Sequence, residues 1–420
     1  MSARRLGVIV LVGCVGLSAC TTSSTTPSGS NVGTTVVADS VWKRCGDIEC
    51  VQIEVPIDYS VPDGALMPLA VYRRESVTDT DAPPVVLVPD YLYGDTAQEL
   101  IERAPAHLGS NWTAHTLISI SRRGTEDSPM PAGSEHLVST RDVARDIDYV
   151  RSFLDLGELS AMGWGSGATA LAVLAVENPD ALSRMVLDSP SHPFLPVQDR
   201  VSTQISSDNA IVAEALRWCV SHISCSMNAN VAKSFNLFRT NTRIGIVDEK
   251  VTSTVVARAS RAAFAAADPQ AFFSGISQAT EGDSAPLLSL AGTGASPHMV
   301  QVLCADETRE GAQLIAQQLA VNHADTNRFF SLGDDYVAYE QCAQLPEVPH
   351  PLDGLNSPTQ SSSVQALVIV AENNPVTSSA LSTGLAQQFS WTLYALPLWR
   401  HLVVGHDDPT TTRAIEFLTR

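Results

Sequence analysis

The stretch that decides the fold reads AMGWGSGAT, at residues 161–169. It follows an apolar run at Leu159–Gly163 that is typical of a buried strand, and it leads into a helix-like pattern at Ala168–Asn178. Glycines at alternate positions suit a sharp turn in which the end of a strand and the start of a helix pass within contact distance. We therefore predict a tight strand-to-helix turn.

The glycine spacing also indicates which residue stands at the apex of this turn. The residues two before and two after the apex must be small, because strand and helix touch there. Gly163 and Gly167 meet this requirement if Gly165 is the apex. If Ser166 were the apex, the indole of Trp164 would occupy a tight position and clash. The predicted apex is Gly165, which has no side chain.

The sequence around the turn alternates strand-like and helix-like segments, which is typical of a doubly wound, mostly parallel sheet. Helical patterns occur at Thr140–Leu156, Ala168–Asn178 and Ser378–Gln388. Two alternating runs, Val51–Val55 and Leu66–Tyr72, predict strands near the start. Short, nearly continuous apolar runs predict buried strands at Pro84–Val88, Thr116–Ile120, Leu159–Gly163, Met185–Leu187, Ala366–Val370 and Trp391–Leu396.

One long stretch interrupts this alternation. Between residues 193 and 350, helical patterns follow one another without a convincing strand, most clearly at Ile205–His222, Val255–Ala266 and Glu307–Asn322. A helical block inserted between two sheet strands is typical of a cap domain. We predict a core made of residues 41–192 and 351–420, with the cap at 193–350.

The N-terminus resembles a bacterial lipoprotein signal peptide. Two arginines precede the apolar run Leu6–Leu17, which is short for a membrane span, and the run ends in Leu-Ser-Ala-Cys at Cys20. The alternative is an ordinary secretory peptide that happens to contain cysteine. We expect residues 1–19 to be removed, Cys20 to be lipidated, and residues 20–40 to form a flexible tether. The expected location is the extracytoplasmic face of the cell membrane, with release from it as the alternative.

Export makes the cysteine count informative. Beyond Cys14 in the leader and Cys20 at the anchor, six cysteines remain, and an even number in an oxidising compartment indicates disulfides. Several pairings are possible, and the local one is the simplest: Cys45–Cys50, Cys219–Cys225 and Cys304–Cys342. Their spacings match no zinc pattern, so no metal site is predicted.

Composition excludes some function classes. The 420 residues carry a formal charge of −19 with only three lysines, so nothing favours nucleic-acid binding. Arginine in place of lysine, together with abundant alanine, favours a GC-rich bacterial genome. No cofactor is predicted.

The turn resembles the nucleophile elbow of α/β-hydrolases, in which G-x-S-x-G places a serine at the apex. Over residues 42–420 the chain also resembles, in order, the actinobacterial tripeptidyl-aminopeptidase-like serine exopeptidases of the peptidase S33 type. The resemblance implies the α/β-hydrolase fold with a helical cap, and an ancestral release of short peptides from free N-termini. The matching blocks are Cys45…Glu49-Cys50-Val51…Val55-Pro56-Ile57-Asp58-Tyr59, Arg123-Gly124-Thr125, Thr140-Arg141-Asp142…Asp146-Ile147-Asp148, Arg184–Asp188, Cys304-Ala305-Asp306 and Asn374-Pro375-Val376-Thr377.

The departures from this family concern its catalytic residues. The resemblance places the serine on Gly165, the triad acid on Asn374 and the oxyanion-hole loop on Pro89–Asp95. The histidine is assigned to His406, with His401 as the weaker candidate. Without a hydroxyl there is nothing for the histidine to deprotonate, and an amide in place of the acid favours the wrong imidazole tautomer. We interpret these as three independent defects of one site.

The oxyanion positions are Asp90, Tyr91 and the backbone of Ser166, and a carboxylate there would repel the developing negative charge. We therefore predict a lipid-anchored pseudo-hydrolase that binds a peptide, an envelope component or a partner protein in its cleft or cap. The alternative is an active serine hydrolase that releases N-terminal tripeptides and uses Ser166 as a displaced nucleophile with His406.

Overall fold

The computed structural model describes residues 41–78, 82–91, 95–227, 230–292, 297–324, 339–342, 349–352, 355 and 363–420. The chain divides into two units, Met1–Ser40 and Val41–Arg420. The predicted signal peptide, the lipidation site Cys20 and the tether lie outside the described residues. Those three expectations therefore stay predictions.

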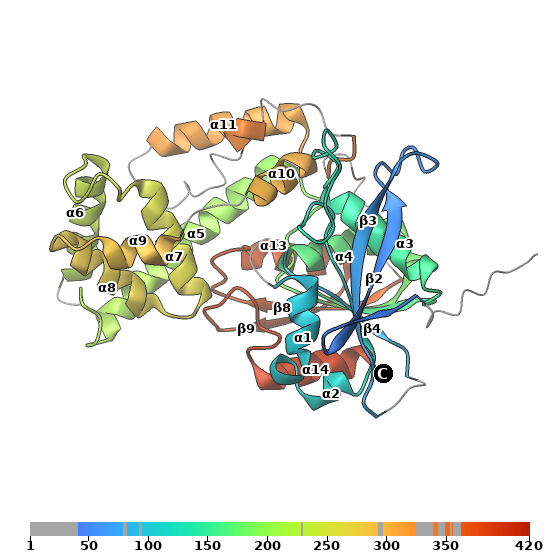
Figure 1. Cartoon of the computed structure of the whole chain (residues 1–420). Coiled ribbons are helices and arrows are strands. Elements are labelled where there is room, and N and C mark those ends of the chain that lie inside the picture. The colour runs from blue at the N-terminus through green and yellow to red at the C-terminus, as the bar shows by residue number, and fades with distance from the viewer. Residues whose placement is uncertain are drawn as a thin grey trace, which may run out of the picture. The chain divides into compact units, whose positions relative to one another are not determined.

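The described residues of the second unit form one nine-stranded sheet in the order β1-β2-β3-β5-β4-β6-β7-β8-β9 (Figure 1). The first three strands and the β3–β5 pair are antiparallel, and every pair from β5 to β9 is parallel. Eight strands coincide with predicted ones, and the short β1 was not predicted. The strands are β1 Lys43–Cys45, β2 Ile48–Pro56, β3 Leu66–Arg74, β4 Val85–Val88, β5 Leu117–Ile120, β6 Leu159–Trp164, β7 Leu182–Asp188, β8 Gln365–Ala371 and β9 Thr392–Leu396.

Helices cover both faces of the sheet, because successive strand side chains point to opposite sides. Val86 and Val88 of β4 pack into a cluster with α3 Thr140–Phe153, α4 Gly165–Glu177 and α13 Ser379–Phe389. Val85 and Leu87 pack on the other face, in a cluster with three further helices. These are α1 Ala97–His107, α2 Ser110–Thr113 and α14 Asp408–Leu418.

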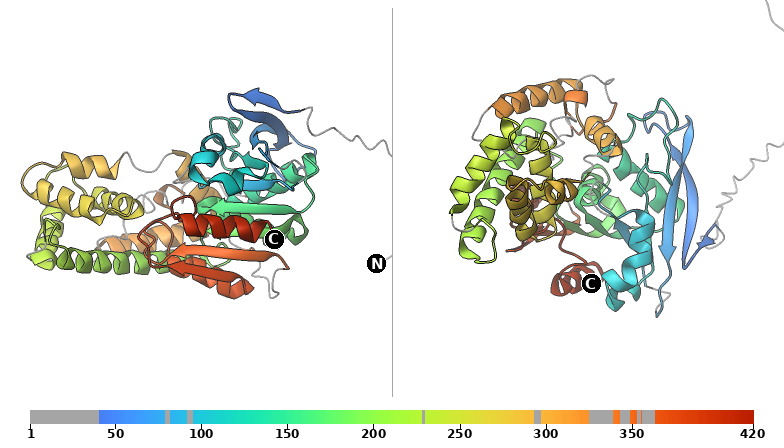
Figure 2. Two further views of the ribbon diagram at one scale, coloured as in Figure 1. Left: turned by 90° about the horizontal axis from the view of Figure 1, so that it is seen from below. Right: turned by 60° about the vertical axis from the view of Figure 1, so that its left-hand side comes forward.

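The cap follows β7 and precedes β8, as a set of helices that packs around its own apolar core (Figure 2). In the part of the cap that the structure describes, no strand interrupts the helices. Phenylalanines dominate its core, including the fully buried Phe238, Phe264 and Phe272. The helices are α5 Val197–Ser221, α6 Val231–Arg243, α7 Ser253–Ala265, α8 Pro269–Thr280, α9 Ala285–Ala291, α10 Pro297–Asp306 and α11 Arg309–Ala324.

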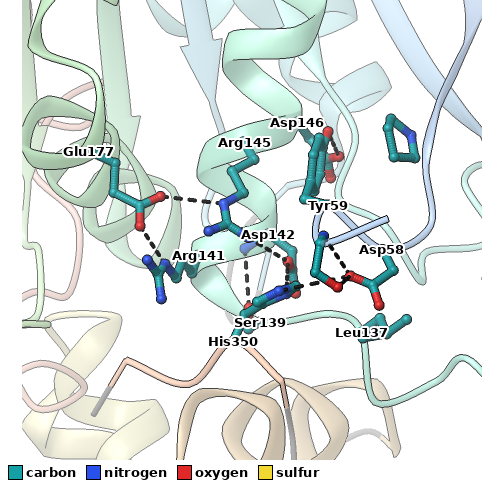
Figure 3. A network of polar contacts seen from close by, with 12 residues as sticks. Asp58, Tyr59, Leu137, Ser139, Arg141, Asp142, Arg145, Asp146, Glu177 and His350 are labelled. Atoms are coloured by element: carbon teal, nitrogen blue, oxygen red, sulfur yellow. Dashed lines mark hydrogen bonds and ion pairs between the residues drawn. The ribbon is translucent and has the colours of Figure 1, made fainter. Parts of the chain in front are cut away.

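A polar network attaches the C-terminal end of the cap to the core (Figure 3). Nδ1 of His350 lies 2.9 Å from Oδ1 of Asp142 on α3, and the other oxygen of Asp142 accepts the hydroxyl of Ser139 at 2.7 Å. Burial by itself raises the pKa of Asp142, but the bond from His350 and the charge of Arg123 outweigh burial and lower it. The chain around His350 is thereby fixed beside the N-terminus of α3.

The structure pairs the six cysteines locally, as the sequence predicts. The pairs are Cys45–Cys50, Cys219–Cys225 and Cys304–Cys342, with Cα atoms 5.9, 5.2 and 4.9 Å apart. Among the described residues, no helix is both long enough and apolar enough to cross a membrane.

Candidate functional site

The elbow has the geometry that its glycines predict. Gly165, where β6 gives way to α4, has a φ of +47°, a left-handed conformation that side chains disfavour. A Cβ on Gly163 would lie 2.6 Å from the backbone nitrogen of Ala168, and one on Gly167 would lie 2.3 Å from the carbonyl oxygen of Val88. These are the two tight positions, so Gly165 is the apex.

The space beside the apex is filled by the carboxylate of Asp90, from the loop that follows β4. A Cβ on Gly165 would lie 2.4 Å from both Cγ and Oδ2 of Asp90, so a side chain at 165 and this carboxylate exclude each other. Oδ1 of Asp90 accepts the backbone N–H of Ser166 at 3.1 Å and its hydroxyl at 2.8 Å. Asp90 is 2 % exposed.

His401 completes the site from the loop after β9. Its Nε2 lies 2.7 Å from Oδ2 of Asp90, and its Nδ1 lies 3.2 Å from Oδ1 of Asn374. The backbone N–H groups of Val376 and Thr377 donate to that same amide oxygen, while the amide nitrogen donates to the carbonyl of His401. The orientation of the Asn374 amide is therefore fixed, with its oxygen toward the imidazole.

Both ring nitrogens of His401 thus face hydrogen-bond acceptors. Neutral imidazole has one donor and one acceptor nitrogen, whereas imidazolium has two donors. The geometry is satisfied by imidazolium paired with the carboxylate of Asp90. Burial alone raises the pKa of Asp90, but the hydrogen bonds from His401 and Ser166 outweigh burial and hold it below its usual value.

Asp188, at the end of β7, positions the loop that carries His401. Its Oδ2 accepts the backbone N–H groups of Val403 and Val404, each at 2.7 Å, and burial raises its pKa to about 6. The hydroxyl of Ser189 donates to the carbonyl of His401 at 2.6 Å. The loop is held from both sides of the imidazole.

The prediction that His406 holds the histidine position was wrong. Its ring packs edge-on against His107, with centroids 4.9 Å apart, and burial, together with the charges of Arg400 and His107, lowers its pKa to about 4. His406 lines a second cavity, beside Trp164. Because Asp188 holds the loop at residues 403 and 404, the chain faces the elbow at His401 and turns away at Gly405, which has a φ of +90°.

Of the predicted oxyanion positions, two meet at the apex and one does not. Asp90 and the backbone of Ser166 are bonded to each other, whereas Tyr91 packs against the core and its hydroxyl donates to the carbonyl of Ile120. Residues 92–94 of this loop lie outside the described part of the chain.

A cavity of about 190 Å³ lies between the core and the cap, directly over this site. Asp90, Gly165, Ser166 and His401 line it from the core. The cap contributes charged side chains that form ion pairs, Arg200 with Glu307 at 2.6 Å and Arg261 with Asp208 at 3.8 Å. Within the described residues, no group of three or more His, Cys, Asp or Glu is arranged to hold a metal ion.

Comparison with known proteins finds similar solved structures at low sequence identity. The chain matches no protein-family model and no curated protein. A probable hydrolytic enzyme from Pseudomonas aeruginosa is similar at 12 % identity and a TM-score of 0.43, over 88 % of this chain and 94 % of that one. The proline iminopeptidase of Mycobacterium smegmatis is similar at 13 % identity and a TM-score of 0.45, over 87 % and 97 %.

A thermophilic esterase from Thermogutta terrifontis is similar at 12 % identity and a TM-score of 0.39, over 87 % of this chain and 96 % of that one. The structure itself gives separate evidence for the fold. In the sheet, β4 and β5 exchange places relative to their order in the chain, and a set of helices is inserted between β7 and β8. By its own strand order, its elbow and its helical insertion, the chain has the α/β-hydrolase fold.

Proposed function

We propose that this chain is a pseudo-hydrolase, which binds a ligand in the cavity between core and cap without hydrolysing it. The observation that carries the proposal is the carboxylate of Asp90 beside Gly165, at the place where an active hydrolase has its nucleophile. On the evidence of its sequence, we further propose that Cys20 is lipidated and holds the protein at the extracytoplasmic face of the membrane.

Acyl transfer by a serine hydrolase needs an attacking oxygen, a base with a free lone pair and a positive oxyanion hole. Gly165 supplies no oxygen. The Nε2 of His401, which would serve as the base, donates to Asp90 instead. The N–H of Ser166, which would serve the oxyanion hole, also donates to Asp90, whose charge would repel a developing oxyanion. Gly165 thus removes the first of these functions, and the carboxylate of Asp90 disables the other two.

The departures at residues 165, 374 and 90, interpreted from the sequence as independent defects, are therefore coupled to one another. In the family that the sequence resembles, the negative partner of the imidazole stands at the position of Asn374. Here Asn374 is neutral and the charge stands on the other side of the ring, at Asp90. Loss of the side chain at 165 makes room for that carboxylate, so the pair remains electrically balanced within the protein.

The cavity defines what a ligand must tolerate. Its walls combine apolar side chains such as those of Val201, Ile205 and Leu381 with the hydroxyl groups of Thr169 and Thr377 and with carboxylates and guanidinium groups that are paired with each other. We propose a ligand with both apolar and polar groups, such as a short peptide or an envelope component, with a protein partner on the cap as the alternative.

The experiment is labelling with a fluorophosphonate probe, read by intact mass, alongside hydrolysis of N-terminally free tripeptide substrates. We expect neither labelling nor turnover. The positive control is the triple variant Asp90→Gly/Gly165→Ser/Asn374→Asp, which restores the attacking oxygen, empties the oxyanion hole and returns the charge to position 374. Labelling of the native chain that disappears in Ser166→Ala would overturn the proposal.

A second candidate function has one observation in its favour. Asp90 itself lines the cavity, with one oxygen on the N–H that follows the apex, so its carboxylate could attack the carbon of an epoxide or an alkyl halide, which opens the ring or displaces the halide and forms an ester. Water would then attack the acyl carbon of that ester, release the alcohol and regenerate the carboxylate. The base for that water would have to be His401, whose Nε2 proton is already donated to Asp90. Turnover of epoxide and alkyl halide substrates in ¹⁸O-labelled water decides the matter, since only this mechanism incorporates ¹⁸O into Asp90.

A further inference from the structure

The end of the cap carries an unusual surface, which we name the cap tip and define as the exposed side chains of residues 217–227 and 230–250. Helix α6 lies at the end of the cap that is far from the sheet (Figures 1 and 2). Five of the eleven large apolar side chains that are exposed among the described residues lie in the cap tip. They are Val220, Ile223, Leu237, Ile244 and Ile246, exposed by 64, 95, 56, 64 and 66 %.

Helix α6 explains part of this exposure, because it has apolar residues on two sides. Phe235 and Phe238 point into the phenylalanine core of the cap and are buried. Lys233 and Leu237, four residues apart on α6, are both exposed, and the exposed Ile244 follows directly after the end of the helix. Helical residues four apart share one face, so the face of α6 that carries Lys233 and Leu237 points away from the protein.

The charge of the cap tip is opposite to that of the chain. The segment that forms the cap tip holds five basic residues, Arg217, Lys233, Arg239, Arg243 and Lys250, and two acidic ones, Asp248 and Glu249, so its formal charge is +3. Of the basic residues, Arg217 is paired with Glu214, which lies just before this segment. Two of the three lysines of the chain, Lys233 and Lys250, belong to the cap tip, and the whole chain carries a formal charge of −19. A basic surface on an acidic protein complements an anionic partner.

We propose that the cap tip binds the surface of a membrane that contains anionic lipids. Exposed aliphatic side chains with lysine and arginine beside them suit the boundary between headgroups and acyl chains, where the aliphatic groups insert and the cations pair with phosphates. This contact is independent of the proposed ligand site and of the proposed acyl chain on Cys20.

The experiment is hydrogen–deuterium exchange of the full chain with two kinds of vesicle, pure phosphatidylcholine and a mixture with phosphatidylglycerol. An acyl anchor would hold the protein on both kinds alike, so a difference between them reports the charged surface alone. We expect peptides that cover residues 217–250 to exchange more slowly with the phosphatidylglycerol vesicles. Equal exchange in both, or the same slowing without vesicles at high protein concentration, would overturn the proposal; the latter would indicate a second copy of the chain.

Matched variants separate the two parts of the surface. Lys233→Gln/Arg243→Gln removes two cations and is expected to weaken partition onto anionic vesicles by about 30-fold, at about fivefold for each charge. Ile244→Asn/Ile246→Asn is expected to lose the slowed exchange as well. The control is Val77→Asn, since Val77 is 75 % exposed and lies outside the cap. Slowed exchange that persists in both cap-tip variants would refute the proposal.

Discussion

The exclusion between a side chain at residue 165 and the carboxylate of Asp90 makes a quantitative prediction. In Gly165→Ala, the left-handed backbone costs about 1–2 kcal/mol for any residue other than glycine. The new Cβ would also lie 2.4 Å from Cγ and Oδ2 of Asp90, so the carboxylate has to move. Its movement leaves His401 and the N–H of Ser166 without their acceptor, and breaking a buried charge pair costs about 3–5 kcal/mol.

A double-mutant cycle with Asp90→Gly separates the cost of the left-handed backbone from the cost of displacing the carboxylate. In that background no carboxylate is displaced, so Gly165→Ala should cost only the backbone term of about 1–2 kcal/mol. The coupling free energy between the two positions should therefore be about 3–5 kcal/mol. The assay is urea unfolding followed by circular dichroism with the disulfides intact, and equal m-values show that the same surface is exposed in each variant.

The control for the cycle is Gly275→Ala in the cap. Its Cβ would lie 3.3 Å from Cδ1 of Leu287, a contact that has no connection with Asp90, so its effect should add to that of Asp90→Gly. If Gly165→Ala and Asp90→Gly were also additive within about 0.5 kcal/mol, the carboxylate would not occupy the nucleophile's space.

Three further predictions concern the histidines and a disulfide. In the reactivated triple variant, His401→Ala should abolish fluorophosphonate labelling while His406→Ala leaves it, because only His401 faces the apex; the reverse result would restore the original assignment. His192 is buried and burial lowers its pKa to about 4, so the unfolded chain takes up a proton between about pH 6.5 and 4 that the folded chain does not. The native chain therefore loses stability as the pH falls through this range. The midpoint of urea unfolding should fall less with pH in His192→Gln than in the native chain, and parallel curves of midpoint against pH would contradict this. Removing the Cys304–Cys342 bridge, which spans 38 residues, should lower the free energy of unfolding by about 4 kcal/mol, and a change below about 1 kcal/mol in denaturant titrations would show that the loop is already constrained.

The sequence predicted much of the fold because its strands are buried on both faces. Their continuous apolar runs are visible without any knowledge of the partner strands, and so β4 to β9 were found close to their observed bounds. The elbow was also predicted, since three glycines with steric requirements of their own leave one possible apex. The short β1 was missed, because a strand of three residues that ends at the disulfide-bonded Cys45, just before a turn, carries no periodicity.

The site was predicted only in part. Sequence spacing cannot tell which of two histidines five residues apart faces the elbow, because that depends on Asp188 holding residues 403 and 404. The role of Asp90 was missed for a related reason. From the sequence, an acid in the oxyanion loop is expected to repel the developing oxyanion. However, the missing side chain at 165 leaves space for a carboxylate, and the missing charge at 374 leaves the imidazole without a negative partner, which a carboxylate can supply.

The most direct test of the central claim is the protonation of the His401 ring, measured by ¹⁵N nuclear magnetic resonance of histidine-labelled protein near neutral pH. Comparison with His401→Gln assigns the signals. If Asp90 stands in the nucleophile's place, both ring nitrogens should carry protons, with Nε2 hydrogen-bonded to a carboxylate. A neutral ring with an unprotonated Nε2 would contradict the account, because it would return to the site the base that hydrolysis requires.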